Sequence, residues 1–531
     1  MPELPLFGGG EEFANVGGVE DSVTGASNTA RGHRKAARTR EVIADTPRSH
    51  PRKVEAALRV TLGLKKRITR KVSQTCGALA RLSRPSAGSW RIVIRTEGRS
   101  GGWAGLRPRL LAKFGVGMKT IVLPVRSRAR SLIGTTCAML FLDLLSCAGS
   151  DWPQYRGPHR TGVTDEKSWL ESWPTEGPTV AWRAKVGLGF SSMVVARGRV
   201  ATAGHDKAQD TLYCFDAVSG KSLWKHSYAA ELGDKYFEGG TTGSPTFDGE
   251  NLYWLSRWGD LFCLGASDGK IIWSKNIAEE TKAPIPTWGF SGAPLVHENL
   301  LVLNVGDAGI ALDKSNGKIV WKSAEKDAGY SSPLPLQRNG DWLALLSNAE
   351  SYLAVNLKTG QEVWRFRWLT EYGVNAADPI VSGDRIFIST GYGKGATLIN
   401  LASGKPEQEW KNKSLRTQLN PSVLVDGYLY GVDGDTTTTA TLKCLELATG
   451  TEKWAQAGFG SGGVIAANGK LIALSGSGEL IVAPASPSGF KPVARFQILG
   501  GKCWTAPVLA NGFIYCRNSR GDLAVADVRK R

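Results

Sequence analysis

From residue 178 onward, short apolar stretches alternate with turn residues in a pattern that repeats along the chain. Six segments share an apolar stretch, a turn containing Gly and a second stretch that ends in Trp, as in 214–225 and 444–455. Before such segments lie two further apolar stretches, joined by tight turns such as Asp248-Gly249 or Asn468-Gly469. Four strands per repeat, without long amphipathic helical patterns, predict an all-β domain.

The repeat length predicts a β-propeller. Successive repeat Trp residues are 43 to 49 residues apart, close to the length of one four-stranded blade. Phe496 replaces the Trp in the seventh repeat, and the eighth repeat runs out of chain after three strands. We expect residues 178–186 to supply its fourth strand and so close the ring. The first strand of each blade is predicted to start at one of eight positions, which are Ser191, Thr242, Ser291, Ser331, Asn375, Leu419, Gly462 and Trp504.

The repeated Trp residues are interpreted as core. An indole on the outer strand can fill the wedge between neighbouring blades and bury on the order of 200 Å². We therefore assign them a structural role rather than that of a ligand cage. The series comprises Trp182, Trp224, Trp273, Trp321, Trp364, Trp410 and Trp454.

The basic charge of the chain is concentrated near its N-terminus. The whole chain carries 66 Lys and Arg against 48 Asp and Glu, whereas residues 151–531 carry 40 against 38. Residues 1–117 show no helical or strand period and contain basic runs such as 31–40, so we expect a disordered basic extension. The alternatives are a nucleic-acid- or membrane-binding tail and a start codon assigned too early. The remainder lacks the charge of a nucleic-acid-binding domain, so no nucleic acid is expected as its partner.

Residues 118–150 have the layout of a secretory signal peptide. A basic start at Met118, an apolar segment over 131–145 and small residues over 146–150 follow one another. We expect translation from Met118, export to the periplasm or cell surface, and a mature chain that opens with a leader segment over 151–177. Residues around Cys147 also resemble a lipoprotein box, so lipidation and membrane attachment at Cys147 are the alternative to simple cleavage.

Cys and His residues form no metal or disulfide pattern. Five of the eight Cys residues lie after residue 150 at irregular spacing, which favours buried free thiols. No two of the six His residues have a metal-ligand spacing. Asp433 and Asp435 flank a Gly, and we interpret this segment as a turn rather than a calcium site. No metal is expected.

The repeat resembles that of the PQQ-like, or quinoprotein-type, β-propellers, where PQQ is pyrroloquinoline quinone. The resemblance is carried by an Ala, a turn ending in Gly, three residues and a Trp, as in 217–225 and 448–455. The segment 152–163 is similar to the leader of secreted bacterial proteins of this family. The resemblance implies a monomeric, eight-bladed propeller over 178–531, built of four-stranded antiparallel blades.

Two functional classes carry this repeat. Quinoprotein dehydrogenases oxidise alcohols or sugars with PQQ and Ca²⁺, whereas propellers similar to the outer-membrane assembly lipoprotein are non-enzymatic scaffolds. The resemblance to the dehydrogenases would imply an adjacent Cys pair and an acidic Ca²⁺ ligand set, and this sequence has no adjacent Cys pair. We predict a scaffold without cofactor that binds an envelope protein or polysaccharide. The alternative is a PQQ-dependent oxidoreductase.

The partner site is predicted on the rim where the first strand of each blade starts. The turns between second and third strands reach the same rim, and Trp, Tyr and Arg dominate binding hot spots. Arg257 and Trp258 are favoured because they lie in such a turn, outside the Trp repeat. The alternative is that the strand-start aromatic residues only plug the channel. The rim candidates are Arg257, Trp258, Trp288, Tyr330, Asn375, Trp504 and His205.

Overall fold

The computed structural model describes residues 95–97, 124–126, 150–435 and 439–530. They belong to two compact units, Met1–Cys147 and Ala148–Arg531. In the first, β1 (Arg95–Glu97) and β2 (Pro124–Arg126) pair in parallel. Most of the predicted signal peptide, including its lipidation residue Cys147, and most of the basic extension lie outside the described residues. Within the described ranges, no helix has the length and apolar character needed to cross a membrane.

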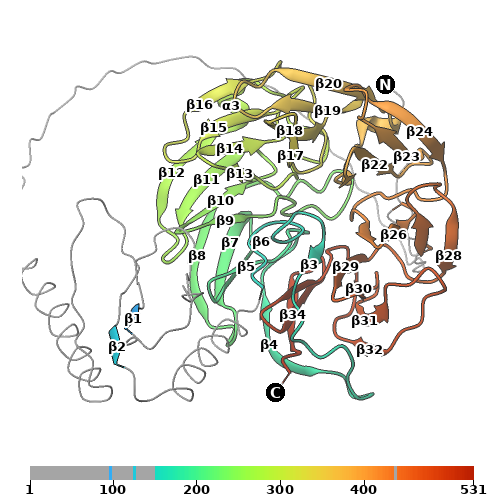
Figure 1. The fold of residues 1–531 in the computed structure, drawn as a ribbon. Helices are drawn as coiled ribbons and strands as arrows, with labels where there is room; N and C mark the ends of the chain where they lie inside the picture. Colours follow the sequence, from blue (N-terminus) through green and yellow to red (C-terminus); the bar gives the residue numbers. More distant parts are fainter. Residues whose placement is uncertain (1–94, 98–123, 127–149, 436–438, 531) are drawn as a thin grey trace, which may run out of the picture. The chain divides into compact units, whose positions relative to one another are not determined.

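The second unit is a ring of eight antiparallel sheets around a central channel, as the sequence predicts (Figure 1). We call the strands of each blade A to D, from the channel outward. The first four blades are β5 (Val194–Ala196), β6 (Arg199–Asp206), β7 (Gln209–Asp216) and β8 (Ser222–Ala229); β9 (Thr246–Asp248), β10 (Asn251–Leu255), β11 (Asp260–Gly265) and β12 (Ile271–Asn276); β13 (Leu295–His297), β14 (Leu300–Leu303), β15 (Ile310–Asp313) and β16 (Ile319–Lys322); and β17 (Leu334–Arg338), β18 (Asp341–Ser347), β19 (Ser351–Asn356) and β20 (Glu362–Arg367).

The remaining four blades complete the ring, and the last takes its outer strand from the start of the propeller. They are β21 (Ile380–Ser382), β22 (Arg385–Thr390), β23 (Gly395–Asn400) and β24 (Glu407–Asn412); β25 (Val423–Val425), β26 (Tyr428–Asp433), β27 (Thr441–Glu446) and β28 (Glu452–Gln456); β29 (Gly463–Ala467), β30 (Lys470–Leu474), β31 (Glu479–Pro484) and β32 (Ala494–Gln497); and β33 (Val508–Ala510), β34 (Phe513–Arg517), β35 (Asp522–Asp527) and β4 (Thr179–Lys185). Two short helices, α3 (Ile277–Thr281) and η1 (Glu371–Gly373), lie in connections between blades.

Each repeat Trp packs against the following blade. The Trp224 indole donates a hydrogen bond to the Ala266 carbonyl at 3.1 Å, and a Cβ on Gly269 would lie 2.5 Å from the indole. Gly269 also has a φ of +68°, so both its backbone and its close contact require glycine. Four other indoles also donate to a carbonyl and pack against a glycine of the following blade. They are Trp182 with Ala217 and Gly220, Trp273 with Lys314 and Gly317, Trp321 with Leu357 and Gly360, and Trp410 with Leu447 and Gly450.

The junction between blades 4 and 5 departs from this rule. Trp364 Nε1 is buried without a hydrogen-bond partner among the described residues, and a Cβ on Gly404 would meet no atom within 4 Å. The turn between β23 and β24 is one residue longer than the turn between β11 and β12. The longer turn moves the glycine away from the indole, so Trp364 contributes to this junction through apolar packing only.

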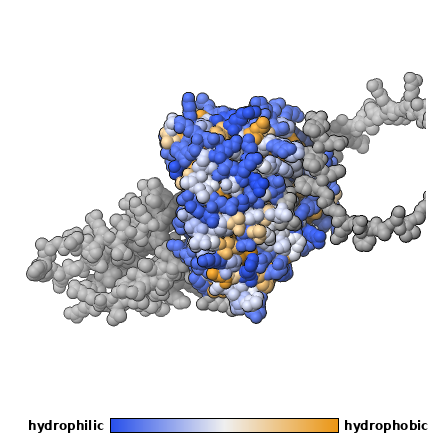
Figure 2. Space-filling view, turned by 90° about the vertical axis from the view of Figure 1, so that its right-hand side faces the viewer, coloured by the Kyte–Doolittle hydropathy of each residue, from blue (hydrophilic) through white to orange (hydrophobic). Residues whose placement is uncertain are grey.

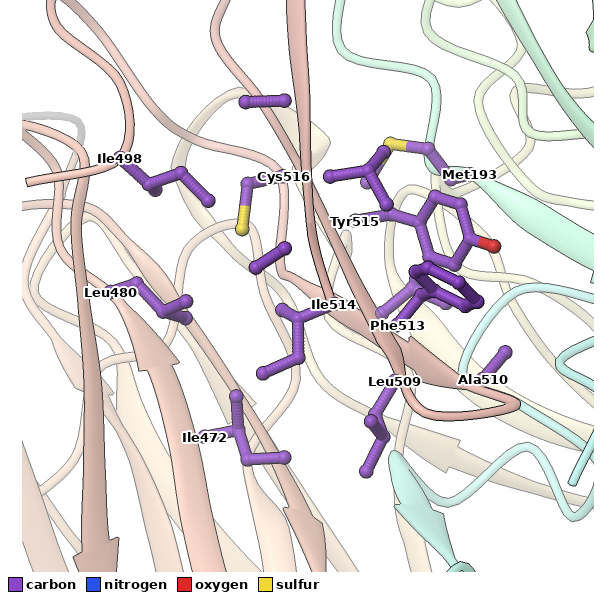
Figure 3. Packing of buried hydrophobic residues seen from close by; sticks show 14 of the residues in the cluster. Met193, Ile472, Leu480, Ile498, Leu509, Ala510, Phe513, Ile514, Tyr515 and Cys516 are labelled. Carbon is purple, nitrogen blue, oxygen red and sulfur yellow. The ribbon is translucent and has the colours of Figure 1, made fainter. Parts of the chain in front are cut away.

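The ring meets itself at β4 and β35. The two strands pair antiparallel, with Trp182 opposite Val525. Phe496 of blade 7 packs against Gly177, where a Cβ would lie 2.1 Å from the phenyl ring. Gly177 precedes β4, so the incoming chain places a glycine where other blades have a hairpin turn. The apolar core of this region includes Ile472 and Leu480 of blade 7 and Ile514 of blade 8 (Figure 3).

The leader segment fills one end of the channel. Trp152 pairs through its backbone with Val195 of blade 1, and the Pro153 carbonyl accepts from Phe247 N of blade 2 at 2.8 Å. Arg156 donates to the Ser422 carbonyl at 2.9 Å before blade 6, and Arg160 to the Pro294 carbonyl at 2.7 Å before blade 3. The strand β3 (Val163–Thr164) then pairs in parallel with β29 of blade 7. We call this end, which carries the A–B turns, the leader rim.

The outer side of the propeller is mainly polar. Figure 2 shows hydrophilic residues over most of the visible side, with hydrophobic residues in small groups. The five Cys residues of the propeller are buried free thiols, which confirms the interpretation from their spacing, and they are Cys214, Cys263, Cys444, Cys503 and Cys516.

Candidate functional site

The opposite end of the channel carries the B–C turns and the connections from one blade to the next, and we call it the loop rim. Its longest connections are 230–245 between blades 1 and 2, 277–294 between blades 2 and 3, and 368–379 between blades 4 and 5. Loops on a rigid scaffold commonly carry binding residues. This rim therefore offers the most side chains that are not needed to hold the blades together.

Half-buried aromatic side chains lie along the loop rim in contacting groups. Phe190 stacks on Trp504 with ring centroids 5.4 Å apart and also contacts Phe237 at 5.8 Å. Tyr236, the residue before Phe237, contacts Trp288 at 5.9 Å, and Trp288 contacts Tyr330 at 5.9 Å. The aromatic belt, as we call this set, thus runs from blade 8 past blades 1 and 2 to blade 4. It consists of Trp504, Phe190, Phe237, Tyr236, Trp288 and Tyr330.

Arg257 supports the belt from below. It is 2% exposed, and its guanidinium donates to the carbonyls of Leu232 (3.1 Å), Gly240 (3.2 Å) and Trp288 (3.4 Å). It also lies against the ring of Phe237, 5.1 Å from its centroid. Burial lowers the pKa of Arg257 below its ordinary value. The expectation of an exposed rim contact is therefore corrected, because Arg257 holds the two longest loops of blades 1 and 2 in place.

Asn375 and His205 are also buried rather than presented on the rim. Asn375 is fully buried and donates to the carbonyls of Asn348 at 2.9 Å and Trp368 at 3.1 Å. His205 is 8% exposed, and its Nδ1 lies 2.8 Å from Oδ1 of the buried Asp210. Burial raises the pKa of Asp210, and the contact with His205 opposes that rise. Asn375 thus fixes the backbone beneath the rim, and His205 pairs with a buried carboxylate.

Trp258, Trp288, Tyr330 and Trp504 remain accessible on this rim. Trp258 is half-buried and its Nε1 donates to the Glu231 carbonyl at 2.9 Å. The Lys502 ammonium lies 4.2 Å from the centroid of the Trp504 ring and is ion-paired with Glu238. Of the predicted rim residues, Trp288, Tyr330 and Trp504 are brought together with Phe190, Tyr236 and Phe237, which the sequence analysis did not single out as site residues.

Comparison with known proteins gives the type of repeat. The family model described as "Outer membrane protein assembly factor BamB" matches residues 208–456. Residues 208–456 therefore match the PQQ-like repeat, and they lie within a ring of eight sheets. No curated protein matches the sequence of the chain.

Similar solved structures include an assembly factor and two alcohol dehydrogenases. BamB from Moraxella catarrhalis is 15% identical, with a TM-score of 0.47, and the match covers 66% of this chain and 100% of that chain. The quinohemoprotein alcohol dehydrogenase from Comamonas testosteroni is 12% identical, with a TM-score of 0.55, covering 72% and 81%. The corresponding enzyme ADHIIG from Pseudomonas putida HK5 is 14% identical, with a TM-score of 0.52 and the same coverage. At these identities, the likeness to the two dehydrogenases concerns the fold alone.

A site for PQQ and Ca²⁺ would need several oxygen ligands for the ion among the described residues. Over 150–435 and 439–530, no three His, Cys, Asp or Glu side chains lie together as a metal site. The carboxylate of Asp433 is already ion-paired with Arg416 at 2.8 Å and Lys443 at 3.0 Å. Ca²⁺ prefers six to eight oxygen ligands. The described residues therefore do not fit this ion.

A buried cation that the sequence analysis missed joins the last blade to the first. Arg517, at the end of β34, is fully buried and donates to the carbonyls of Ser191, Ala203 and Gly189 at 2.8 to 3.0 Å. Burial lowers its pKa to about 10, so it stays charged at neutral pH. Its partners are backbone atoms more than three hundred residues away, and no sequence motif signals such a contact.

Proposed function

We propose that this protein is an exported, non-enzymatic scaffold of the cell envelope that binds a protein or polysaccharide on the aromatic belt. The belt is the observation that carries the proposal. Its six side chains are half-buried and mutually packed, so they are held in place before a partner arrives. Aromatic side chains of this kind supply most of the energy in many interfaces.

The contrast between the ends of the channel supports the choice of rim. The leader occupies the leader rim and is hydrogen-bonded to several blades there. A partner at the loop rim would cover aromatic surface, and each square ångström of apolar surface removed from water contributes about 25 cal/mol. The match to an assembly factor and the expected signal peptide both favour a location in the envelope.

The double variant W288A/Y330A tests the proposal. Capture of partners from envelope extract should fall by at least about thirtyfold, since a central aromatic contact is worth about 2 kcal/mol. The matched control is W342A, an aromatic residue of the β17–β18 hairpin that is 37% exposed. Unchanged capture by W288A/Y330A, or an equal loss in W342A, would contradict the aromatic belt as the binding surface.

The oxidoreductase alternative is tested directly on the purified protein. It is incubated with PQQ and Ca²⁺, and reduction of an electron-accepting dye is followed with alcohols and sugars as substrates. We expect no turnover above that of free PQQ. Substrate-dependent turnover would replace the scaffold proposal.

A further inference from the structure

Two lysines lie over one buried indole on the loop rim of blades 4 and 5, and the charge of an arginine acts on one of them. The ammonium groups of Lys394 and Lys411 lie 4.7 and 5.2 Å from the centroid of the Trp368 ring. Arg367 precedes Trp368 at the end of β20. Trp368 is 2% exposed, and its Nε1 donates to Thr390 Oγ1 at 2.9 Å, which fixes the ring. The indole thus serves as a rigid base that holds positive charge close together.

These three cations are left without carboxylate partners. Arg365, two residues earlier, is ion-paired with Asp307 at 2.9 Å, and Arg385 on the next blade is paired with Glu409 at 2.9 Å. Across 150–435 and 439–530, the ion pairs include none of Arg367, Lys394 and Lys411. Burial, followed by the charges of Lys411 and Arg367, lowers the pKa of Lys394. An anion bound here would remove the mutual repulsion.

Aromatic surface adjoins the cations. Tyr392 lies in the same B–C turn as Lys394, and its ring meets that of Tyr372 edge to face at 5.4 Å. Tyr372 is 39% exposed and follows Trp368 in the connection between the two blades. Tyr392 is half-buried. An exposed aromatic ring and a half-buried one near cations suit a ligand that combines apolar ring faces with oxyanions.

We propose that Arg367, Lys394 and Lys411 bind the oxyanions of an acidic polysaccharide, with its sugar rings against Tyr372 and Tyr392. This inference rests on the proposed scaffold function and names the class of its partner. A nucleic acid is less suited, because residues 151–531 carry nearly equal numbers of basic and acidic residues. Nucleic-acid binding generally uses a larger basic surface that follows the phosphate backbone.

The test compares K394Q/K411Q with K358Q/K405Q. The control also removes two lysine charges, one from blade 4 and one from blade 5, but at exposed turns between strands C and D. Binding of polygalacturonate, dextran sulfate, neutral dextran and a single-stranded oligonucleotide is measured by calorimetry at low and physiological ionic strength. The carboxylate and sulfate polymers distinguish the two sources of oxyanion. The urea midpoint of each variant is recorded to separate binding from stability.

We expect the wild type and K358Q/K405Q to bind at least one acidic polysaccharide, and K394Q/K411Q to bind it about tenfold more weakly, which corresponds to about 1.4 kcal/mol. Neutral dextran should not bind, and the urea midpoints should agree. Equal weakening in both variants, no binding by the wild type, or tighter binding of the oligonucleotide would overturn the inference. A lower urea midpoint in K394Q/K411Q with unchanged affinity would likewise show that the lysines only cover Trp368.

The two proposals can fail separately. If W288A/Y330A loses its envelope partner while no acidic polysaccharide binds, the scaffold function stands and the present inference fails. If the polysaccharide binds through the two lysines while W288A/Y330A captures every partner, the inference stands and the aromatic belt is not the binding surface.

Discussion

The two ends of the propeller channel are built on different principles. At the leader rim, a segment from outside the blades crosses the channel and satisfies backbone groups of several blades at once. At the loop rim, the blades supply their own connections, which Arg257 and Asn375 fix from below and aromatic side chains cover from above. The difference teaches that a symmetric ring acquires two unlike ends through its connections, with little change to its sheets.

The leader rim is where a substitution should cost most. Trp152 is 1% exposed and packs in the core shared by blades 7, 8 and 1. W152A should lower the free energy of unfolding by about 4 kcal/mol, because a large buried side chain leaves a cavity. Urea denaturation measures the loss. If W152A unfolds like the wild type, the leader is not an integral part of the ring, and the contrast between the two ends fails.

A smaller effect, dependent on pH, should come from Asp378 at the start of blade 5. Burial raises the pKa of Asp378 to about 6, against the opposing charges of Arg156 and Arg160 from the leader. The folded protein then keeps a proton that the unfolded chain has lost, so stability falls as pH rises from about 4 to 6. D378N should remove this slope and, above pH 6, be more stable by up to about 3 kcal/mol. Unfolding measured across this pH range checks the result, and parallel curves for the two proteins would contradict it.

At the loop rim, R257A should cost about 2 kcal/mol, because three carbonyls lose a charged donor. R257K should not restore the stability, since one ammonium cannot reproduce the spread of the guanidinium donors. Arg520 is the matched control, as it lies in the B–C turn of blade 8 but is exposed. Thermal unfolding of R257A and R520A distinguishes them, and equal midpoints would show that Arg257 does not hold the rim.

The repeated architecture could be predicted from sequence because its signals are local. Turn glycines, alternating apolar positions and the regularly spaced Trp residues each specify structure within one blade, and together they gave eight sheets. The replacement of the repeat Trp by Phe496 in the seventh blade could also be predicted, because aligning the repeats shows which residue stands at the Trp position. The geometry that the sequence did not reveal is the close contact of five of these indoles with a glycine in the following blade.

The candidate site was predicted only in part, because its burial depends on distant segments. The rim aromatic residues could be placed by their position at strand starts. Arg257 looked like an exposed loop residue, yet its environment is made by carbonyls of the 230–245 connection and of Trp288. The leader was recognised as a separate segment, but no periodicity indicated that it would cross the channel.

The way the ring meets itself has a consequence for biosynthesis. β4 emerges from the ribosome first among the propeller strands, and its partner β35 emerges almost last. Until β35 is made, β4 therefore has an open edge and no sheet to join, and blade 8 cannot form. Unpaired strand edges of this kind are prone to wrong associations, so the interval between the synthesis of β4 and that of β35 is when this edge is open to them.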